Sequence, residues 1–599
     1  MNDTNPTDAR PARRRRGKGD KQTEVDWVAR FAEDVIAAAH ARDPERTIVC
    51  ASGLSPSGPI HLGNLREVMT PHLVADEIAR RGIAVEHIIS WDDYDRFRKV
   101  PAGVEGIDSS WEAHIGKPLT SVPAPRGSDH PNWAEHFKAA MSESLAALGV
   151  EFRGISQTEQ YTSGAYRDQV LHAMARRGEI DAVLGQYRTK AAPEPVPSSQ
   201  QSSEDAAAEA EAIEGSGAAS EDDGGGASGY FPFKPYSLAF GTDDTRVVAY
   251  DDDTTELTYV ARGPQGEEVT ESMRLDSDFR GKLVWKVDWP MRWAYEGVDF
   301  EPSGVDHSSP GSSYVVGGEL VGPIFGGHQP IGPMYAFVGI AGQAKMSSSR
   351  GGVPTPADAL QIMEPALLRW LYTRRRPNQS FSVAFDAEIQ RLYDEWDALG
   401  RKVTTPAAQP GDLAMHARAM GTAAGELPTT PVVLPYRALA SVIDITGGDP
   451  DQSLRIVRGM VGDDVDLDSL DPLRPRLDCA QTWVLTQMPE SDRTHVRETP
   501  DAELLASLEP GQRESLDLLA ERLEDDWSLD GLTTLVYGIP KIRAGFDIGE
   551  KKLPPEVKAE QRALFALLYR LLVGSDTGPR IPTLLLSLGA ERVRTLIQP

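Results

Sequence analysis

The residues best suited to chemistry lie in a turn rich in glycine, serine and proline, which reads Ser-Gly-Leu-Ser-Pro-Ser-Gly-Pro-Ile-His-Leu-Gly-Asn at 52–64. Its glycines let a polyphosphate approach the backbone closely, and a helix that starts after it offers free N–H groups and the positive end of its dipole. His61 would lie at that helix start, where one ring N–H can donate to a phosphate oxygen. An ordinary strand-to-helix turn has the same composition, so this turn alone does not establish a site.

A second candidate loop lies far downstream and reads Ala-Lys-Met-Ser-Ser-Ser-Arg-Gly-Gly at 344–352. It is basic and made mostly of small residues. Taken alone, it also has the composition of a solvated surface loop. Taken together, the glycine-rich turn with its His and the later loop with its Lys and Ser residues favour a shared phosphate site over two unrelated surface loops.

The elements that must position the first loop can be identified from apolar patterns. Thr47–Ala51 predicts a buried strand, and the apolar residues at 65, 68, 69 and 73 recur at helical spacing after the turn. Ala84–Trp91 predicts the next strand. Strand, helix and strand at this spacing form a βαβ unit with a parallel sheet, which binds ligands beyond the carboxyl ends of its strands.

In this order, the two loops resemble the HIGH and KMSKS elements of class I aminoacyl-tRNA synthetases. Asn64 stands in place of the last His of HIGH, and Ser348 stands in place of the second Lys of KMSKS. Both departures are usual in the class I lysyl-tRNA synthetases, which the chain resembles over most of its length. The missing Lys removes one cation from the phosphate site, so Lys345 and Arg350 must carry more of the charge.

The resemblance implies which residues act on ATP. The implied catalytic residues are His61, Asn64, Lys345 and Ser347. The implied ATP-binding residues come from both loops and are Pro56, Ser57, Gly58, His61, Gly63, Asn64, Lys345, Met346, Ser347, Ser348 and Ser349. Mg²⁺ would arrive with ATP, because this ion keeps several waters and seldom occupies a cage made only of protein ligands.

A lysine substrate brings an ammonium group, which needs a carboxylate partner once it is desolvated. Asp92 or Asp93, after the second predicted strand, would supply it; a charged loop paired with Arg96 and Arg98 is the alternative. The resemblance places further residues around the amino acid, namely Gly53, Ser55, Trp285, Asp306, His307 and Tyr335.

Aromatic faces suit an alkyl chain or an ammonium group, although Trp285 and Tyr335 also have the character of core residues. A hydrolase triad built from Asp306, His307 and Ser308 is excluded, because adjacent residues cannot form the required relay.

The segment Tyr230–Gly241 departs from the family pattern. Similar stretches in many members read Lys-Pro-Tyr-Cys-x-x-Cys-Gly and help to bind zinc, whereas Ser237 and Phe240 occupy the cysteine positions here. Neither side chain is a thiolate, so we predict no zinc and no other metal site. Only two cysteines occur, Cys50 and Cys479. Because Cys50 ends a predicted buried strand, a reducing, cytoplasmic setting is favoured over a structural disulfide.

The predicted fold is α/β, with a Rossmann-like (HUP-type) parallel-sheet catalytic domain that carries an insertion and is followed by an all-α domain. The expected segments are a disordered basic tail at 1–22, the first catalytic half at 23–190, a disordered acidic linker at 191–229, the insertion at 230–280, the second catalytic half at 281–380 and a helical anticodon-binding domain at 381–599. We also expect two antiparallel strands at 247–250 and 257–260, a last strand at 339–342 and a single helix over 354–373.

The formal net charge of −28 argues against a generic nucleic-acid binder. Screening beyond roughly 8–10 Å gives local patches more weight than the sum. The cluster Arg374, Arg375 and Arg376 is therefore a candidate RNA contact, with cations at a helix C-terminus as the alternative. No apolar run reaches the roughly 18 residues needed to span a bilayer, and no apolar segment follows Arg13–Arg16 as it would in a secretory signal.

The resemblance therefore implies ATP-dependent formation of lysyl-adenylate and transfer of the lysyl group to tRNA(Lys), in the cytoplasm and without a membrane or DNA partner. One alternative is a class I synthetase for glutamate, cysteine or arginine. The other is a synthetase-like RNA-binding protein without catalytic activity. Oligomeric state and the residues that read the anticodon do not follow from the sequence.

Overall fold

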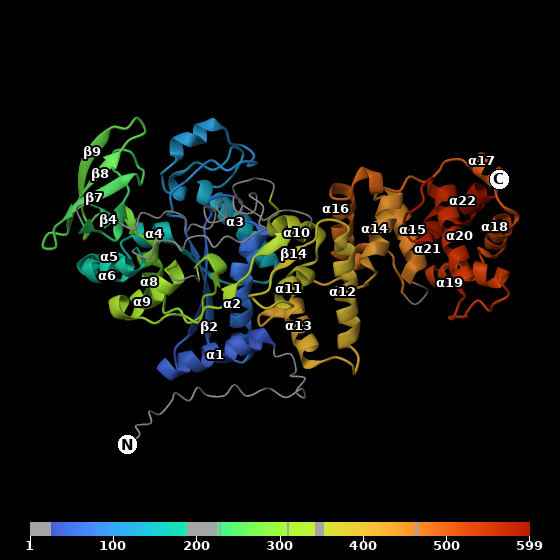
Figure 1. Cartoon of the computed structure of the whole chain (residues 1–599), viewed down its shortest axis with the longest axis horizontal. Helices are drawn as coiled ribbons and strands as arrows, with labels where there is room; N and C mark the ends of the chain where they lie inside the picture. Colours follow the sequence, from blue (N-terminus) through green and yellow to red (C-terminus); the bar gives the residue numbers. More distant parts are fainter. Residues whose placement is uncertain are drawn as a thin grey trace, which may run out of the picture.

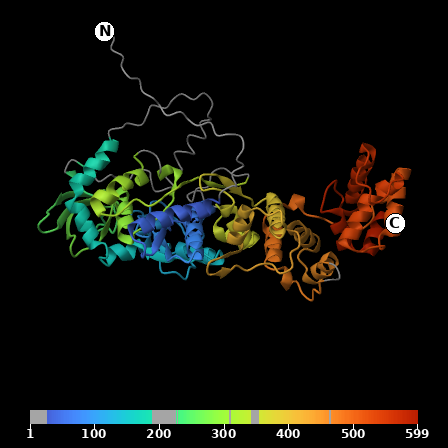
Figure 2. The ribbon, with the colours of Figure 1, turned by 90° about the horizontal axis from the view of Figure 1, so that it is seen from below.

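The computed structural model describes residues 26–188, 225–226, 229–307, 311–341, 353–461 and 465–598. The described part is elongated, with a small β-sheet at one end, a parallel sheet in the middle and the C-terminal helices at the other end (Figure 1). The same order is seen after a quarter turn (Figure 2). The tail predicted at 1–22 and most of the linker predicted at 191–229 lie outside the described residues.

The centre of the molecule is a parallel sheet that confirms the predicted βαβ unit. β1 (Ile48–Leu54), β2 (Val85–Trp91) and β3 (Arg153–Ser156) pair in parallel in the order β1-β2-β3. α2 (Leu62–Arg80) connects β1 to β2, and α1 (Trp27–Arg42) precedes both strands. β1 is apolar and almost wholly buried, as expected of a strand that is covered on both faces.

The sheet continues beyond β1 with residues from much later in the chain. Phe300 bridges in parallel to Cys50 on one side and to Ile331 on the other. Directly after these bridges, β11 (Ser303–Gly304) pairs in parallel with β12 (Met334–Tyr335). The carboxyl ends of strands from both halves of the chain therefore meet at one edge, where open α/β sheets bind ligands.

Two predicted elements differ from the structure. The strand expected last spans Val338–Ile340 as β13, and it pairs in parallel with a later strand, β14 (Phe381–Val383). The single helix expected over 354–373 is two helices, α10 (Pro356–Ile362) and α11 (Pro365–Thr373). Pro365 has no amide hydrogen with which to continue α10, and proline is favoured in the first turn of a new helix.

The insertion contains a three-stranded antiparallel sheet, one strand more than predicted. β7 (Thr245–Tyr250), β8 (Glu256–Arg262) and β9 (Glu268–Arg274) pair in the order β7-β8-β9. The sequence of β9, Glu-Val-Thr-Glu-Ser-Met-Arg, has no clear apolar alternation, so it does not resemble a half-buried strand. In the structure, only Met273 among its residues is buried.

The remaining helices and strands of this part include α3 (Trp133–Ala147), which lies between β2 and β3 in the chain, and the elements on either side of β7, β8 and β9. The latter are α4 (Gln157–Thr162), α5 (Arg167–Ala175), α6 (Arg177–Arg188), β4 (Gly225–Gly226), β5 (Gly229–Tyr230), β6 (Phe233–Pro235), β10 (Gly281–Leu283), α8 (Trp285–Glu296) and α9 (Ser313–Phe325). The antiparallel pair of β10 and β6 returns the chain to α8, which carries several aromatic residues of the site.

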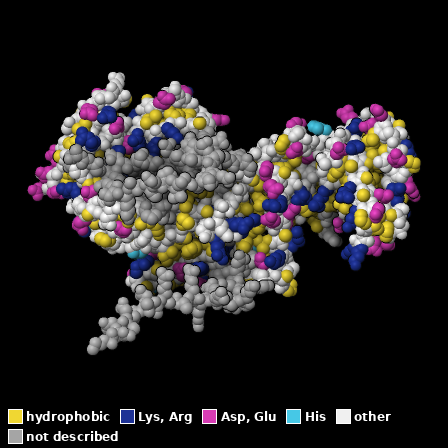
Figure 3. Space-filling model, viewed as in Figure 1, with side chains coloured by type: hydrophobic (Ala, Val, Ile, Leu, Met, Phe, Trp, Pro, Cys, Tyr) yellow, Lys and Arg dark blue, Asp and Glu magenta, His cyan; other side chains and the backbone are white. Residues whose placement is uncertain are grey.

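The C-terminal part is helical as predicted, apart from the two-residue strands β15 (Gly421–Thr422) and β16 (Gly425–Glu426). Its helices are α12 (Glu388–Val403), α13 (Pro410–Met420), α14 (Tyr436–Thr446), α15 (Pro450–Val461), α16 (Arg476–Thr486), α17 (Ala502–Ala506), α18 (Pro510–Arg522), α19 (Leu529–Arg543), α20 (Pro555–Val573), α21 (Ile581–Leu588) and α22 (Ala590–Ile597). The surface narrows before the group of helices that ends the chain, from α17 to α22 (Figure 3). No helix in the described ranges is long and apolar enough to cross a membrane.

Candidate active site

The turn at 52–64 joins β1 to α2, and His61 is the N-cap residue of α2. Its Nδ1 accepts a hydrogen bond from the Gly63 N–H at 3.0 Å. Burial lowers the pKa of His61 to about 4, so the ring is neutral at physiological pH. In a neutral imidazole whose Nδ1 accepts, Nε2 carries the proton. The structure therefore leaves Nε2–H of His61 as a neutral donor at a helix N-terminus.

The other residues of this turn combine exposed hydroxyls with a closely packed backbone. Ser55 and Ser57 are exposed, Pro56 and Gly58 are buried, and Gly63 and Asn64 are half-buried in the first turn of α2. A Cβ at Gly58 would lie 3.3 Å from the Pro101 side chain. The turn thus presents N–H and O–H donors and no carboxylate, a set that suits phosphate oxygens.

Lys345, Met346, Ser347, Ser348 and Ser349 lie outside the described residues, as does Arg350. The described residues on either side show where this segment begins and ends. The Ala341 N–H donates to the Val383 carbonyl at 3.0 Å, and the Pro354 carbonyl accepts from the Leu62 N–H at 3.1 Å. Because Leu62 follows His61 directly, the chain re-enters the described fold beside the first loop.

Glu67 on α2 is a site residue that the sequence analysis missed. The Tyr335 hydroxyl donates to Glu67 Oε2 at 3.1 Å, and the backbone N–H of Gly53 also binds this carboxyl group. Burial, and then the nearby Glu301 and Asp92, raise the pKa of Glu67 to about 8. Two predicted lysine-binding residues, Gly53 and Tyr335, thus meet at an acid group with weakened ionisation.

Glu301 is the second acid that sequence reasoning missed. It lies on the chain segment next to β1, and it accepts hydrogen bonds from Trp289 Nε1 at 3.1 Å and from Trp293 Nε1 at 2.6 Å. Burial raises the pKa of Glu301 to about 7 although both indoles stabilise the carboxylate. The available signal was the run of tryptophans on α8, because a buried indole N–H requires an acceptor.

The two aspartates after β2 have different environments. Asp92 accepts from Arg292 Nη1 at 2.6 Å, and burial raises the pKa of Asp92 to about 6 against the opposing effect of this guanidinium. Asp93 is completely buried. Its carboxylate accepts from Lys138 Nζ at 3.0 Å, from Ser156 Oγ at 2.7 Å and from the Thr158 N–H at 2.8 Å. Asp93 therefore joins β2 to α3 and α4, which leaves Asp92 as the better candidate for a substrate ammonium.

Aromatic rings lie beside these acids. Trp285 stacks on Trp289 with ring centroids 5.1 Å apart and an angle of 19° between the planes. The Arg292 guanidinium lies over the Trp285 ring, 5.5 Å from its centroid. The His307 ring meets Trp289 edge-on at 5.7 Å. The side chain of Asp306 lies outside the described part of the chain.

We call Glu67, Asp92 and Glu301 the carboxylate cluster. Each of them has a raised pKa, and Asp92 contributes to the raised pKa of both Glu67 and Glu301. Buried like charges are costly unless a cation compensates them. Arg292 already compensates Asp92, whereas the hydrogen-bond donors to Glu67 and Glu301 are neutral. The cluster, with its aromatic neighbours, is thus suited to an organic cation with an alkyl body.

The turn that contains Ser237 and Phe240 is closed by a carboxylate. Glu271 on β9 accepts from Ser237 Oγ at 3.2 Å, from the Leu238 N–H at 2.9 Å and from the Ala239 N–H at 2.8 Å. Phe240 N–H in turn donates to Ser237 Oγ at 3.1 Å. In the described ranges, no group of three His, Cys, Asp or Glu residues is arranged to hold a metal ion.

The arginines after α11 have separate roles. Arg374 pairs with Glu395 at 3.0 Å and lies 4.2 Å from the centroid of the Trp370 ring. Arg375 and Arg376 are exposed. Among the described residues, no carboxylate forms an ion pair with either of these two guanidinium groups, so they remain available to an anionic partner.

The chain is similar to known proteins over most of its length. The family described as "tRNA synthetases class I (K)" matches residues 25–426. A protein named lysine–tRNA ligase from Streptomyces coelicolor is 67% identical over 577 residues, which cover 96% of this chain and 98% of the relative. One of the same name from Pyrococcus furiosus is 31% identical over 579 residues, which cover 95% and 98%.

Among solved structures, a glutamate-tRNA synthetase from Elizabethkingia anophelis is similar over 92% of this chain and 100% of its own, with 12% identity and a TM-score of 0.37. The parallel strand order and the family match agree on the fold independently of this structure.

Proposed function

The chain belongs to the class I tRNA synthetases, in the family of lysine–tRNA ligases, and from that premise we propose how its residues activate L-lysine and charge tRNA(Lys). The reaction has two steps. The lysine carboxylate attacks the α-phosphorus of ATP and pyrophosphate leaves. A hydroxyl of the tRNA 3′ end then attacks the carbonyl carbon of lysyl-adenylate and AMP leaves. The enzyme would work in the cytoplasm, where tRNA is used.

The observation that carries the choice of lysine is the carboxylate cluster. Lysine has two ammonium groups, and Glu67, Asp92 and Glu301 provide three acid groups at the carboxyl edge of the sheet, where Arg292 compensates Asp92 alone. An anionic side chain such as that of glutamate would be repelled at this place. The stacked Trp285 and Trp289 offer apolar faces to the lysine alkyl chain.

Directed hydrogen bonds complete the proposed amino-acid site. Tyr335 holds Glu67 by its hydroxyl, and His307 lies against Trp289. Gly53 and Ser55 belong to the same turn as His61, so the amino acid and ATP would lie on adjacent parts of one loop. Asp306 stays a prediction from the family resemblance.

ATP would be bound by the first loop and by the 342–352 segment. His61 would donate from Nε2 to a phosphate oxygen, and the free N–H groups at the start of α2 would face the same charge. Lys345 would neutralise the pyrophosphate that leaves, helped by Ser347 and the neighbouring serines. Mg²⁺ would enter with ATP and neutralise phosphate charge. Such a reaction needs positioning and charge compensation more than a side-chain nucleophile.

Amino-acid-dependent pyrophosphate exchange tests the specificity, with saturating tRNA(Lys) present throughout. We expect exchange with lysine and none with glutamate, cysteine or arginine. Exchange with another amino acid instead of lysine would contradict the assignment of the cluster. Charging of tRNA(Lys) with labelled lysine, measured on filters, distinguishes a ligase from an RNA-binding relative without activity. RNA contacts by Arg375 and Arg376, and the absence of DNA partners, stay predictions.

A further inference from the structure

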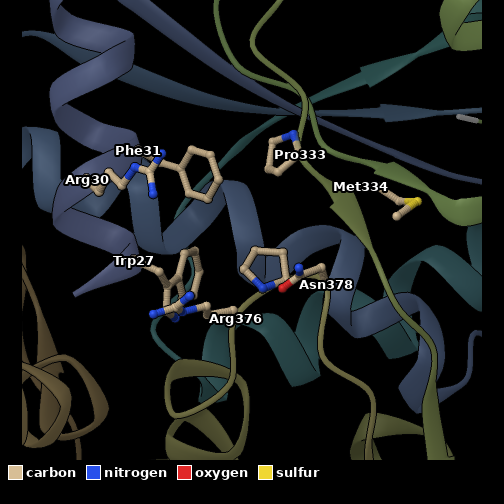
Figure 4. A pocket seen from close by; sticks show the side chains of 8 residues that line it. Trp27, Arg30, Phe31, Pro333, Met334, Arg376 and Asn378 are labelled. Carbon is tan, nitrogen blue, oxygen red and sulfur yellow. The ribbon is translucent and has the colours of Figure 1, made fainter. Parts of the chain in front are cut away.

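A cavity of about 360 Å³ lies outside the carboxylate cluster, between the start of α1 and two loops from the second catalytic half. Trp27 and Phe31 on α1 form one wall, and Met334 lies opposite them (Figure 4). Arg30 and Arg376 lie beside the two aromatic rings in the same view. Neither the lysine site nor the proposed ATP site uses these five side chains.

The aromatic wall is held in place by the fold. Trp27 Nε1 donates to the Thr373 carbonyl at 2.9 Å, which fixes the indole. The rings of Trp27 and Phe31 meet edge-on with centroids 6.2 Å apart, and Phe31 packs on Phe300 at 5.8 Å. A planar ligand would therefore meet a preformed surface and would not need to order it.

The charge at this cavity is opposite to that of the whole chain. The formal net charge is −28, yet the two charged side chains that line the cavity are Arg30 and Arg376, both exposed. In the described part of the chain, neither guanidinium forms an ion pair with a carboxylate. Aromatic rings flanked by unpaired arginines suit an unstacked nucleotide, whose base stacks while its phosphates meet the guanidinium groups.

The chain's own N-terminal segment does not suit the cavity. Residues 1–25 contain no aromatic side chain, and they include four consecutive arginines at 13–16. These arginines would be repelled by Arg30 and Arg376, and they would instead add to the attraction of a polyanion.

We propose that this cavity binds an unpaired nucleotide of the tRNA, with the base against Trp27 and Phe31 and the adjoining phosphates on Arg30 and Arg376. The inference rests on the proposed function, since tRNA is the RNA substrate of such an enzyme. The cavity volume of about 360 Å³ has room for one nucleotide and not for a helical segment. Asn378 at its rim supplies an amide for a base edge.

Consecutive residues connect this cavity with the amino-acid site. On β12, Met334 lines the cavity and Tyr335 binds Glu67. On α2, Arg66 precedes Glu67, and its guanidinium donates to the carbonyls of Ala336 at 3.2 Å, Gln379 at 2.7 Å and Arg376 at 2.6 Å. A nucleotide in the cavity would therefore press on the same strand and loop that hold the lysine-binding groups.

Equilibrium binding of a tRNA(Lys) transcript to the full-length chain tests the proposal. Arg30→Glu reverses a cavity charge, Met334→Trp fills the cavity without changing charge, and Arg401→Glu alters an exposed arginine on α12 that does not line it. We expect Arg30→Glu and Met334→Trp each to raise the Kd roughly tenfold, and Arg401→Glu to leave it within about twofold. Arg30→Glu should also lower the salt dependence by about one unit of slope, whereas Met334→Trp should keep it. Thermal unfolding shows that each variant is folded.

Wild-type affinity in both cavity variants would overturn the proposal, and so would a loss confined to Arg30→Glu, because the arginine would then act without the cavity. Binding of AMP to the same variants is measured in parallel. If Met334→Trp weakens the binding of AMP but not that of tRNA, the cavity binds a free mononucleotide and the proposal is overturned. Failure of the wild-type chain to charge tRNA(Lys) would instead defeat the proposed function, whatever the Kd values are.

Discussion

Glu67, Asp92 and Glu301 are all costly to ionise in the ligand-free enzyme, because burial withdraws water from each carboxylate. Burial and mutual repulsion raise the pKa of Glu67 to about 8 and that of Glu301 to about 7. At neutral pH, part of this cluster is therefore protonated. An ammonium group favours the ionised form, so lysine binding and proton release are coupled.

The first prediction concerns lysine affinity as a function of pH. As pH rises from 6 to 8.5, Glu67 and Glu301 lose their protons, and the KM for lysine should fall. Pyrophosphate exchange at saturating ATP and tRNA measures it. A KM that is constant or rises over this range would show that these acids do not bind the substrate.

The same coupling has a consequence for stability. A carboxyl whose pKa is raised on folding stabilises the fold while it is protonated, and this contribution is lost as pH rises through the folded-state pKa, here about 7 to 8. Saturating lysine should therefore raise the unfolding temperature more at pH 8.5 than at pH 6.

The second prediction separates two tasks of His61. Nδ1 caps α2 and Nε2–H is free to donate. His61→Asn keeps an acceptor for the Gly63 N–H but cannot reach the phosphates, so activation should fall about 10²-fold with little loss of stability. His61→Ala should lose the same activity and a further ~1 kcal/mol of unfolding free energy. Exchange rates and urea unfolding measure both. Equal stability of the two variants would argue against the cap.

At the scale of elements, the connection from β2 to α3 and α4 depends on Asp93. Lys138 from α3 and the start of α4 both bind its carboxylate. The third prediction is that Asp93→Ala lowers the unfolding free energy by about 3 kcal/mol, because Ser156 and the Thr158 N–H lose their buried acceptor and Lys138 is left with the more exposed Glu135 as its partner. The KM for lysine in the folded variant should stay close to wild type. A large rise in KM without destabilisation would return Asp93 to the substrate site.

The segment between β13 and α10 carries the fourth prediction. Its described ends are Ala341 and Val353, and Pro354 is bonded to the residue after His61. Lys345→Ala should lower the rate of adenylate formation by about 10²-fold or more, as loss of one preorganised charge contact does. Lys558→Ala, a change of an exposed lysine on α20, is the charge-matched comparison. An unchanged exchange rate in Lys345→Ala would exclude the assigned role.

At the scale of the whole molecule, Arg476 joins the catalytic part to the C-terminal helices. This α16 side chain is only 3% exposed, and it pairs with Glu364 between α10 and α11 at 2.8 Å and with Asp397 on α12 at 2.9 Å. One guanidinium thus compensates acids from two parts of the chain.

The fifth prediction is that Arg476→Ala destabilises the protein by about 3–5 kcal/mol, because the buried Glu364 and the half-buried Asp397 lose their cationic partner. Arg474→Ala, which removes an exposed ion pair with Asp478, should cost no more than about 1 kcal/mol. Urea unfolding of both variants gives the comparison. Similar effects in the two would show that burial does not decide the strength of the Arg476 pairs.

Local patterns in the sequence determined the strand, turn and helix around His61, the parallel βαβ unit and the helical C-terminal part, because apolar spacing and glycine or proline positions act over a few residues. The tertiary structure alone decided that Glu67 and Glu301 join Asp92, that Asp93 is committed to Lys138, and which nitrogen of His61 keeps its proton. Each of these depends on groups from distant parts of the chain whose approach desolvates a charge or supplies a hydrogen bond. Such energies arise only once the sheet has brought the partners together.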